Sequence, residues 1–266
     1  MRHFLAVLAA LTFPIAASAA PDLTPHRAVY DMGYLKRATD SAFVQVDGRM
    51  VYSYDLTCEG ATYNHRMLLD LVSKQGPTIR SETELSFYET RDGLTMRFHV
   101  REMLNSQLIS ELEGTVTRAS LDDPATVSYS KREGAKGDAP VSLPPRVMFP
   151  LQHTHDLIAA AMDGQVIHNA ATFDGDEVSL ADSFIQPARG VVREEAVVPK
   201  AMAGMKSWIT RVGFYRPESE ESVPYYETQM RFWENGLSGD FTMESDDLGV
   251  LAKLNKVELF EKPVCN

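Results

Sequence analysis

The sequence has few of the residues on which redox, nucleic-acid-binding and membrane-surface proteins depend. Its 266 residues include only two cysteines, and they form no Cys-x-x-C redox pair. Basic residues are also scarce, because 26 lysines and arginines stand against 37 acidic residues and give a formal net charge of −11. Nucleic acid and anionic lipid surfaces require clustered Lys and Arg, so we expect neither of them as a partner.

The common catalytic motifs are missing as well. The sequence contains no G-x-S-x-G nucleophile elbow, no H-E-x-x-H zinc helix and no glycine-rich phosphate loop. The acidic turn of Asp174, Asp176 and Glu177 offers oxygen ligands for calcium, but it lacks the ligand spacing of an EF-hand loop. A solvated turn is the simpler interpretation, and we predict no enzymatic activity, no cofactor and no metal site.

Only one long hydrophobic run is present, and it lies at the N-terminus. A basic start precedes an apolar segment from Phe4 to Ala16, and Ala17-Ser18-Ala19 has the A-x-A form of a cleavage site. The segment is shorter than the ~18 apolar residues that a membrane span needs. We therefore predict a secretory signal peptide over residues 1–19 and a single exported domain over residues 20–266. No lipid anchor is expected, because no cysteine stands at the cleavage point.

The two cysteines lie near opposite ends of the mature chain. In a reducing compartment both would remain thiols, whereas in an exported protein an even number of cysteines indicates a disulfide. We therefore predict a bond between Cys58 and Cys265. It would close a loop of roughly 200 residues, for which the chain-entropy model gives up to about 5 kcal/mol. Such a bond would pin the last strand to one of the first strands and favour a closed sheet.

Most of the mature chain alternates apolar and polar residues as β-strands do. Asp92-Gly93 and Asn235-Gly236 are strong hairpin signals between such segments. Turn signals at short spacing predict a mainly β fold of about thirteen strands, arranged as an antiparallel barrel or a closed sandwich. Residues 133–145 are predicted to be a loop. The predicted strands are 26–35, 48–58, 62–73, 78–90, 94–103, 108–118, 126–132, 166–174, 178–186, 190–198, 208–215, 225–233, 238–245 and 250–260.

One segment, Phe149 to Gly164, has a helical pattern instead. Thr154 is the predicted N-cap, Asp156 complements the first turn, and Gly164 stands where a left-handed C-terminal residue is needed. We therefore predict one central helix over residues 153–164, which joins two β halves as a hinge, plug or lid. Its apolar positions at helical spacing are Leu157, Ile158, Ala161 and Met162.

His153 and His155 are candidate metal ligands or acid–base groups. In an extended segment their imidazoles would point to the same side, but a metal site needs further ligands that the sequence does not supply. We interpret both as residues at the start of the helix. Together with Leu157 and Ile158 they form a possible region for a partner or ligand. A barrel with an apolar interior can also hold an apolar ligand, and the sequence leaves open whether the interior is filled.

Several segments resemble the EipB (envelope integrity protein B) family, a periplasmic family formerly described as a domain of unknown function. The resemblance covers essentially the whole mature chain. The segments that carry it are HRAVYD (26–31), YSYDLTCEG (52–60), YETRDGLTMRF (88–98), FPLQHTHDLIAAAMDG (149–164), TFDGDE (172–177) and RFWENGLSGDF (231–241), with a terminal Cys265.

The resemblance implies a monomeric β-spiral of about fourteen antiparallel strands, similar in shape to periplasmic lipoprotein carriers, with a disulfide that matches Cys58 and Cys265. It also implies a periplasmic role in maintaining the envelope of an alphaproteobacterium, together with a tetratricopeptide-repeat partner. We expect a non-enzymatic protein that binds a protein partner. The alternatives are a carrier of a lipid, acyl chain or lipoprotein, and an envelope hydrolase built on His153, His155 or Asp156.

Overall fold

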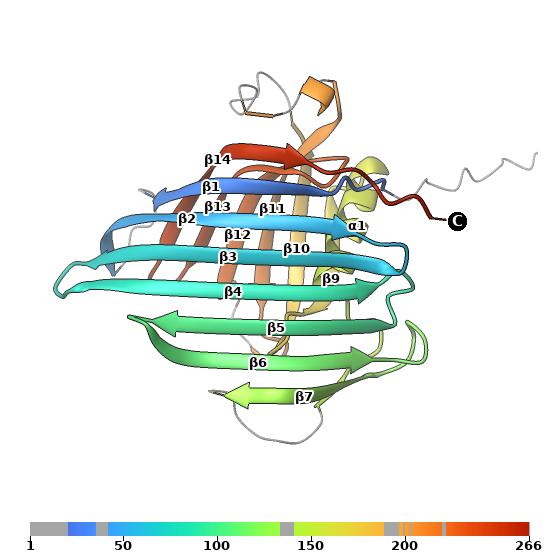
Figure 1. Ribbon diagram of the computed structural model, residues 1–266, viewed down its shortest axis with the longest axis horizontal. Helices are drawn as coiled ribbons and strands as arrows, with labels where there is room; N and C mark the ends of the chain where they lie inside the picture. Colours follow the sequence, from blue (N-terminus) through green and yellow to red (C-terminus); the bar gives the residue numbers. More distant parts are fainter. Residues whose placement is uncertain are drawn as a thin grey trace, which may run out of the picture.

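The computed structural model shows a protein built almost entirely from one antiparallel β-sheet (Figure 1). It describes residues 21–35, 42–133, 141–188, 197–198, 200–202, 204–219 and 222–265, so the predicted signal peptide lies outside the described residues. The elements are β1 (His26–Tyr34), β2 (Phe43–Leu56), β3 (Gly60–Ser73), β4 (Thr78–Thr90), β5 (Thr95–Leu104), β6 (Gln107–Thr117), β7 (Ala125–Glu133), β8 (Val141–Leu143), α1 (Pro150–Met162), β9 (Ile167–Phe173), β10 (Val178–Pro187), η2 (Lys200–Met202), β11 (Ser207–Tyr215), β12 (Tyr226–Trp233), β13 (Ser238–Ser245) and β14 (Gly249–Leu259).

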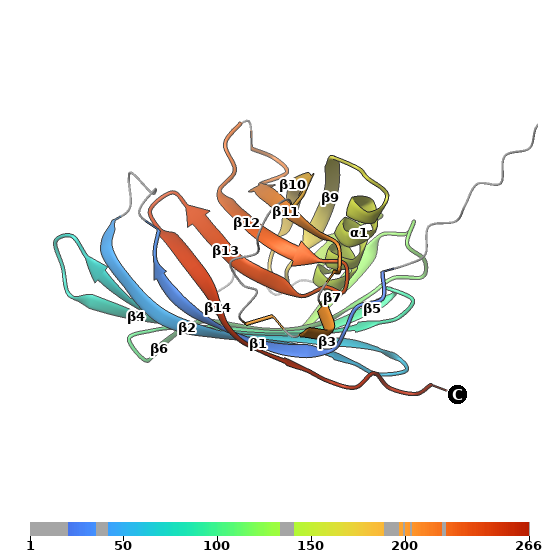
Figure 2. The same ribbon diagram turned by 90° about the horizontal axis from the view of Figure 1, so that it is seen from above.

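The first and last strands lie side by side in the middle of the sheet. The strand order is β8-β7-β6-β5-β4-β3-β2-β1-β14-β13-β12-β11-β10-β9, and Ala28 of β1 stands opposite Val257 of β14. Figure 2 shows β1–β7 as one long curved layer, over which β9–β13 rise as a second layer beside α1. This arrangement confirms the predicted mainly β, spiral or barrel-like fold.

The β4–β5 hairpin shows why the alternating pattern predicts strands well. Phe87 and Phe98 stand directly opposite each other and are both buried, because every second side chain of a strand points to the same face. Gly93 in the connecting turn has a φ of +69°, a left-handed conformation that glycine adopts without steric cost. Gly236 of the second predicted hairpin has a φ of +87°. Both hairpin predictions are confirmed.

Three predicted segments differ from the structure. Strand β2 begins at Phe43, five residues before the predicted start at Gly48. The predicted loop 133–145 contains the short strand β8, which pairs with β7, while residues 134–140 lie outside the described residues. Most of the predicted strand 190–198 also lies outside them, and its described residues, Val197 and Val198, are in a turn and a bend.

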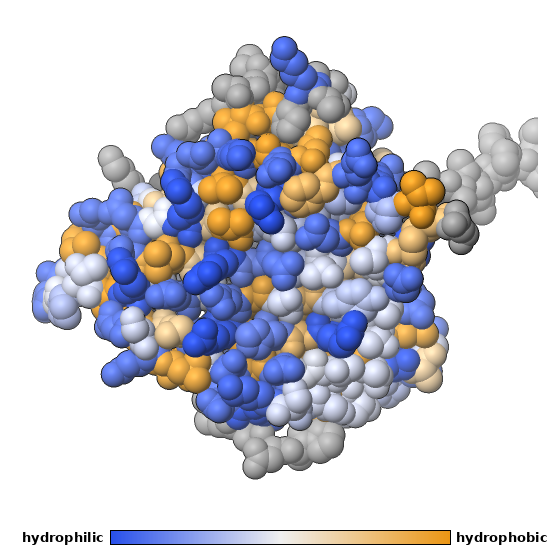
Figure 3. All heavy atoms as spheres, viewed as in Figure 1, coloured by the Kyte–Doolittle hydropathy of each residue, from blue (hydrophilic) through white to orange (hydrophobic). Residues whose placement is uncertain are grey.

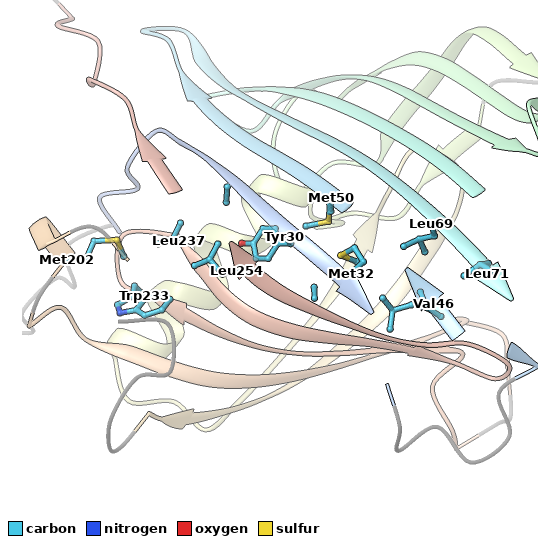
Figure 4. Close-up of a cluster of buried hydrophobic side chains, with 13 residues drawn as sticks. Tyr30, Met32, Val46, Met50, Leu69, Leu71, Met202, Trp233, Leu237 and Leu254 are labelled. Carbon is cyan, nitrogen blue, oxygen red and sulfur yellow. The ribbon is translucent and has the colours of Figure 1, made fainter. Parts of the chain in front are cut away.

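The buried apolar side chains form three clusters within the sheet. Figure 4 shows one of them, in which Tyr30, Met50 and Leu254 pack together and the Tyr30 hydroxyl donates to the Ser238 carbonyl over 2.8 Å. A second cluster surrounds Phe98 and Phe149. The third surrounds helix α1 and includes side chains from both layers, so the helix packs between them.

The two free edges of the sheet, β8 and β9, lie in the middle of the sequence on either side of α1. A single bridge joins the chain after β8 to β9: the Met148 N–H donates to the Ala171 carbonyl over 2.7 Å, and the Phe173 N–H donates to the Met148 carbonyl over 3.0 Å. The pairing of the first and last strands therefore does not close the sheet as predicted. It lies in the middle of the sheet, and the free edges are β8 and β9.

Candidate functional site: helix α1 and its surroundings

Helix α1 begins four residues before the predicted N-cap Thr154. Phe149 is the N-cap residue, with an extended backbone (φ −80°, ψ 161°), and Pro150 occupies the first turn. Proline fits there because its missing N–H would have no partner within the helix. The Thr154 hydroxyl instead donates to the Pro150 carbonyl over 2.9 Å, so Thr154 and Asp156 lie inside the helix. The local cap signal at Thr154 was misleading.

A side chain from a distant strand replaces the missing local cap. The Glu89 carboxylate on β4 accepts hydrogen bonds from the backbone N–H groups of Leu151 at 2.7 Å and Gln152 at 3.0 Å. Those N–H groups have no partner within the helix, and the helix dipole favours a negative charge at this position. Glu89 is 5% exposed, and burial raises its pKa to about 7, although both hydrogen bonds and the Arg118 charge act in the opposite direction.

Arg118 fixes the chain that leads into the helix. Its guanidinium donates to the carbonyls of Gly93 and Val147, both at 2.7 Å, and to Gln152 Oε1 at 2.8 Å. It also lies over the Phe149 ring, 4.5 Å from the centroid. Burial lowers the pKa of Arg118, and the Glu89 charge opposes that effect. Glu89 and Arg118 together bind the helix start to the β4–β5 hairpin.

The C-terminal end of the helix follows the prediction. Gly164 has a φ of +78°, and its N–H donates to the Ala161 carbonyl over 3.1 Å. The Gln165 N–H donates to the Ala160 carbonyl over 2.9 Å. These bonds satisfy carbonyls that the helix leaves open, as in a Schellman motif. The last turn is therefore determined by local sequence, whereas the first turn is determined by Glu89.

His153 lies inside the protein and packs against a second histidine. Its ring stacks on that of His168 in β9 with 6.0 Å between the centroids, and His153 is 9% exposed. Burial and the neighbouring His168 lower the pKa of His153 to about 4. Asp156 Oδ2 lies 3.5 Å from His168 Nε2. The helix thus places one histidine and one carboxylate over the inner face of β9.

The other residues of the predicted partner or ligand region lie on different sides of helix α1. Leu157 and Ile158 are core residues, 6% and 1% exposed. His155 is half-buried, and because successive helical residues are about 100° apart it does not share a side with His153. Within the described parts of the chain, no group of three or more His, Cys, Asp or Glu side chains has the geometry to hold a metal ion.

A row of polar and aromatic side chains from β2 and β3 faces the same interior. The Tyr63 hydroxyl lies 3.2 Å from His65 Nδ1, and the Tyr63 ring meets that of Tyr52 edge to face at 5.0 Å. Burial lowers the pKa of His65 to about 4 and raises the pKa of Tyr63 and of Tyr52. These three groups are therefore neutral near pH 7.

The cysteines are joined as predicted. Cys58 lies in the turn between β2 and β3, and Cys265 lies in the tail after β14, with 5.5 Å between their Cα atoms. The bond therefore ties the C-terminal tail across β1 to the β2–β3 hairpin, because β1 lies between β2 and β14. It reinforces the centre of the sheet rather than its edges.

The motif search missed Glu89 and Arg118, although the sequence carries a signal for each. Glu89 continues the inward-facing alternation of Leu85 and Phe87, and Arg118 follows Val116 in the same way. A charged residue at the end of an apolar strand face requires a partner, since burial of an unpaired charge is costly. The partner itself could not be predicted, because Glu89 and Leu151 are 62 positions apart.

Comparisons with known proteins match almost the whole chain. The EipB-like family model matches residues 17–261. The cell envelope integrity protein EipB of Brucella abortus (strain 2308) is 26% identical over 253 residues, which cover 92% of this chain and 88% of that protein. A crystal structure of a beta-barrel-like protein of a domain of unknown function from Brucella abortus is also similar. The two chains are 25% identical in sequence and superpose with a TM-score of 0.81. The matched region covers 91% of this chain and 100% of the Brucella chain.

No α-helix among the described residues combines the length and apolar character that a bilayer span requires. The family match spans both layers of the sheet, helix α1 and Cys58, and ends at residue 261, within the C-terminal tail and before Cys265. These findings confirm the resemblance of the sequence motifs, and the chain belongs to the EipB-like family.

Proposed function

We propose that this protein is a non-enzymatic periplasmic component that supports cell-envelope integrity by binding a protein partner. The envelope role is supported by the similar protein of Brucella abortus, which is named for that role and matches 92% of this chain. Partner binding is supported by one structural observation: helix α1 occupies the space between the two layers, with Ile158 1% exposed. Where the helix occupies the interior, the outer surface is the part of the protein left for recognition.

Deletion of the gene in its own host tests the envelope role. We expect the deletion strain to become sensitive to detergents and to cell-wall antibiotics, and the wild-type gene to restore resistance. A variant that retains the signal peptide but carries Glu89→Ala serves as a destabilised comparison. Unchanged sensitivity of the deletion strain to both classes of agent would overturn the proposal.

Purification from the periplasm tests partner binding. The family resemblance predicts a tetratricopeptide-repeat protein as partner. We expect reciprocal co-purification of the two proteins from a host that expresses both at native levels, after mild crosslinking. A mixture of the two purified proteins should also elute earlier than either alone. Independent elution of both proteins at high concentration would overturn this part of the proposal.

A specific observation favours the alternative of an apolar carrier. Inward-facing side chains of both layers remain only half-buried, although their strand neighbours are core residues. Leu85, for example, is half-buried beside Phe87, and Val100 is half-buried opposite the fully buried Leu112. Further half-buried side chains packed against the core clusters are Tyr52, Tyr63, Met67, Phe214, Met230, Phe241 and Met243. Such apolar surface is available to an acyl chain.

Native mass spectrometry separates the two alternatives. Protein purified from the periplasm without detergent should carry an added lipid or acyl mass if it is a carrier, and organic extraction should recover that molecule. Uniformly unliganded protein that still restores detergent resistance would rule out the carrier and favour partner binding.

A further inference from the structure

Strand β9 is an edge strand whose outer side is only partly covered. Alternate residues of an edge strand direct their backbone N–H and C=O groups away from the sheet. In β9 these include Ala171 and Phe173, whose groups bond to Met148. By the same alternation the backbone groups of Ile167 and Asn169 also face the edge, and no described strand pairs with them. The described part of the chain thus pairs with one end of this edge, at Ala171 and Phe173, and leaves the other end open.

The outer face beside this open edge is apolar. We define the β9 patch as three exposed side chains on the outer faces of β9 and β10: Ile167 (65% exposed), Leu180 (41%) and Phe184 (44%). Phe184 stands directly opposite Ile167. A hollow of about 480 Å³ adjoins the patch and is lined by Val166, Pro187 and Ile209 among other residues. Figure 3 shows hydrophilic and hydrophobic residues interspersed over the outer face of the larger layer.

Among the described residues, the charges around this edge are predominantly negative. Asp182 lies between the two apolar rows of the patch, opposite Asn169, and Asp163 follows the end of helix α1. Asp156 on the inner side has its side chain 48% exposed. The one described arginine in this part of β11, Arg211, is paired with Glu227 at 2.9 Å. A second copy of this acidic chain is therefore disfavoured, and a basic partner is favoured.

We propose that the open edge of β9 is a docking site at which a partner protein adds an extended, basic strand. The added strand would bond to the backbone of Ile167 and Asn169, place apolar side chains beside the β9 patch, and place lysine or arginine side chains near Asp156 and Asp163. This assignment rests on the proposed partner binding and specifies the chemistry of that partner. It also gives β9 a function that accounts for its exposed edge, which natural proteins normally protect.

A synthetic peptide of alternating valine and lysine tests the site directly. Its binding to the full-length mature protein is measured by fluorescence polarisation, and hydrogen exchange reports the amides of Ile167 and Asn169. We expect binding to slow the exchange of these two amides. A peptide with N-methyl groups on alternate residues cannot form the strand ladder and should bind at least about tenfold more weakly. A peptide with glutamate in place of lysine should also bind more weakly.

Matched variants locate the binding surface. Ile167→Lys adds a positive charge to the patch and should lower the affinity for the valine–lysine peptide by about tenfold. Ile109→Lys is the control, because Ile109 is similarly exposed (52%) on β6, far along the sheet from β9. Equal binding to both variants, or strong protection of the Ile167 and Asn169 amides in the protein without peptide, would overturn the docking site.

The same two variants separate this site from the envelope role. In the deletion strain, Ile109→Lys should restore detergent resistance and Ile167→Lys should not. Full restoration by Ile167→Lys would overturn the docking site and leave the envelope role intact. A deletion strain without any sensitivity would instead overturn the envelope role itself.

Discussion

At the scale of single residues, the most consequential side chain is Glu89. It is the carboxylate that caps helix α1, and it is held in a buried position by two backbone N–H donors. Its charge is favoured by the helix dipole and Arg118 and opposed by burial, which is the stronger effect and raises the pKa to about 7. One residue therefore couples the start of the helix to pH.

We predict that Glu89→Gln becomes more stable relative to wild type as pH rises. The folded protein holds a proton on Glu89 that the unfolded chain releases near pH 4.5, so the stabilising contribution is complete below that value and is lost as pH passes about 7. The difference can reach about 3 kcal/mol over this range. Urea unfolding at a series of pH values measures it.

Glu113 on β6, which is exposed and separated from β4 by β5, provides the control, and Glu113→Gln should show no such dependence. A free-energy difference between Glu89→Gln and wild type that stays constant from about pH 4.5 to about pH 8 would contradict the assignment of a buried, titrating carboxyl group.

His153 should give the opposite pH dependence. Its folded pKa is lowered to about 4 from 6.5, so the unfolded chain binds the proton first and stability is lost as pH falls from about 6.5 towards 4. We expect His153→Phe to reduce this acid loss, by at most about 3 kcal/mol. Chemical unfolding at pH values on both sides of that window is the measurement. His155→Phe, on the same helix, is the control, and an identical acid loss in both variants would argue against a buried neutral His153.

At the scale of elements, hairpins and the helix end were predictable because they depend on neighbouring residues. Asp92-Gly93 and Asn235-Gly236 each need a left-handed glycine, and Gly164 needs the same conformation to end the helix. The helix start was mispredicted: Pro150 is a local signal for the first turn, but the capping carboxylate comes from Glu89 on β4, which no neighbouring residue indicates. Strand β8 was missed because three residues carry too little alternation to be recognised.

We predict that Gly236→Ala destabilises the protein by about 1–2 kcal/mol. The alanine would have to adopt the left-handed φ of +87°, and its Cβ would lie only 3.0 Å from Leu23 Cδ2. Gly164→Ala is the matched control, since its φ is +78° but its Cβ would meet nothing within 4 Å. Thermal unfolding of both variants should show the larger loss for Gly236→Ala, and a larger loss for Gly164→Ala would contradict the contact with Leu23.

At the scale of the whole molecule, the disulfide and the β1–β14 ladder act on the same part of the sheet. Nine residue pairs join β1 to β14 independently of the disulfide bond. The disulfide spans 207 positions and acts mainly by restricting the unfolded chain. The native fold should therefore persist without the bond, but with less stability.

We predict that the double variant Cys58→Ser/Cys265→Ser folds to the same sheet and loses up to about 5 kcal/mol of unfolding free energy. Far-ultraviolet circular dichroism should remain unchanged, and the urea midpoint should fall. Wild-type protein treated with a reductant should lose a similar amount, whereas the double variant should not respond to the reductant. A wild-type midpoint that is insensitive to complete reduction would contradict this prediction.

The sequence by itself determined the strand pattern, the two hairpins, the helix end, the single possible cysteine pair and the family motifs, because each depends on residues that are close in the chain or unique in it. Only the tertiary structure decided that β8 and β9 form the free edges, that Glu89 and Arg118 hold the helix, and that Leu157 and Ile158 are buried. These features arise from contacts between distant segments, and local periodicity carries no information about which distant segments will meet.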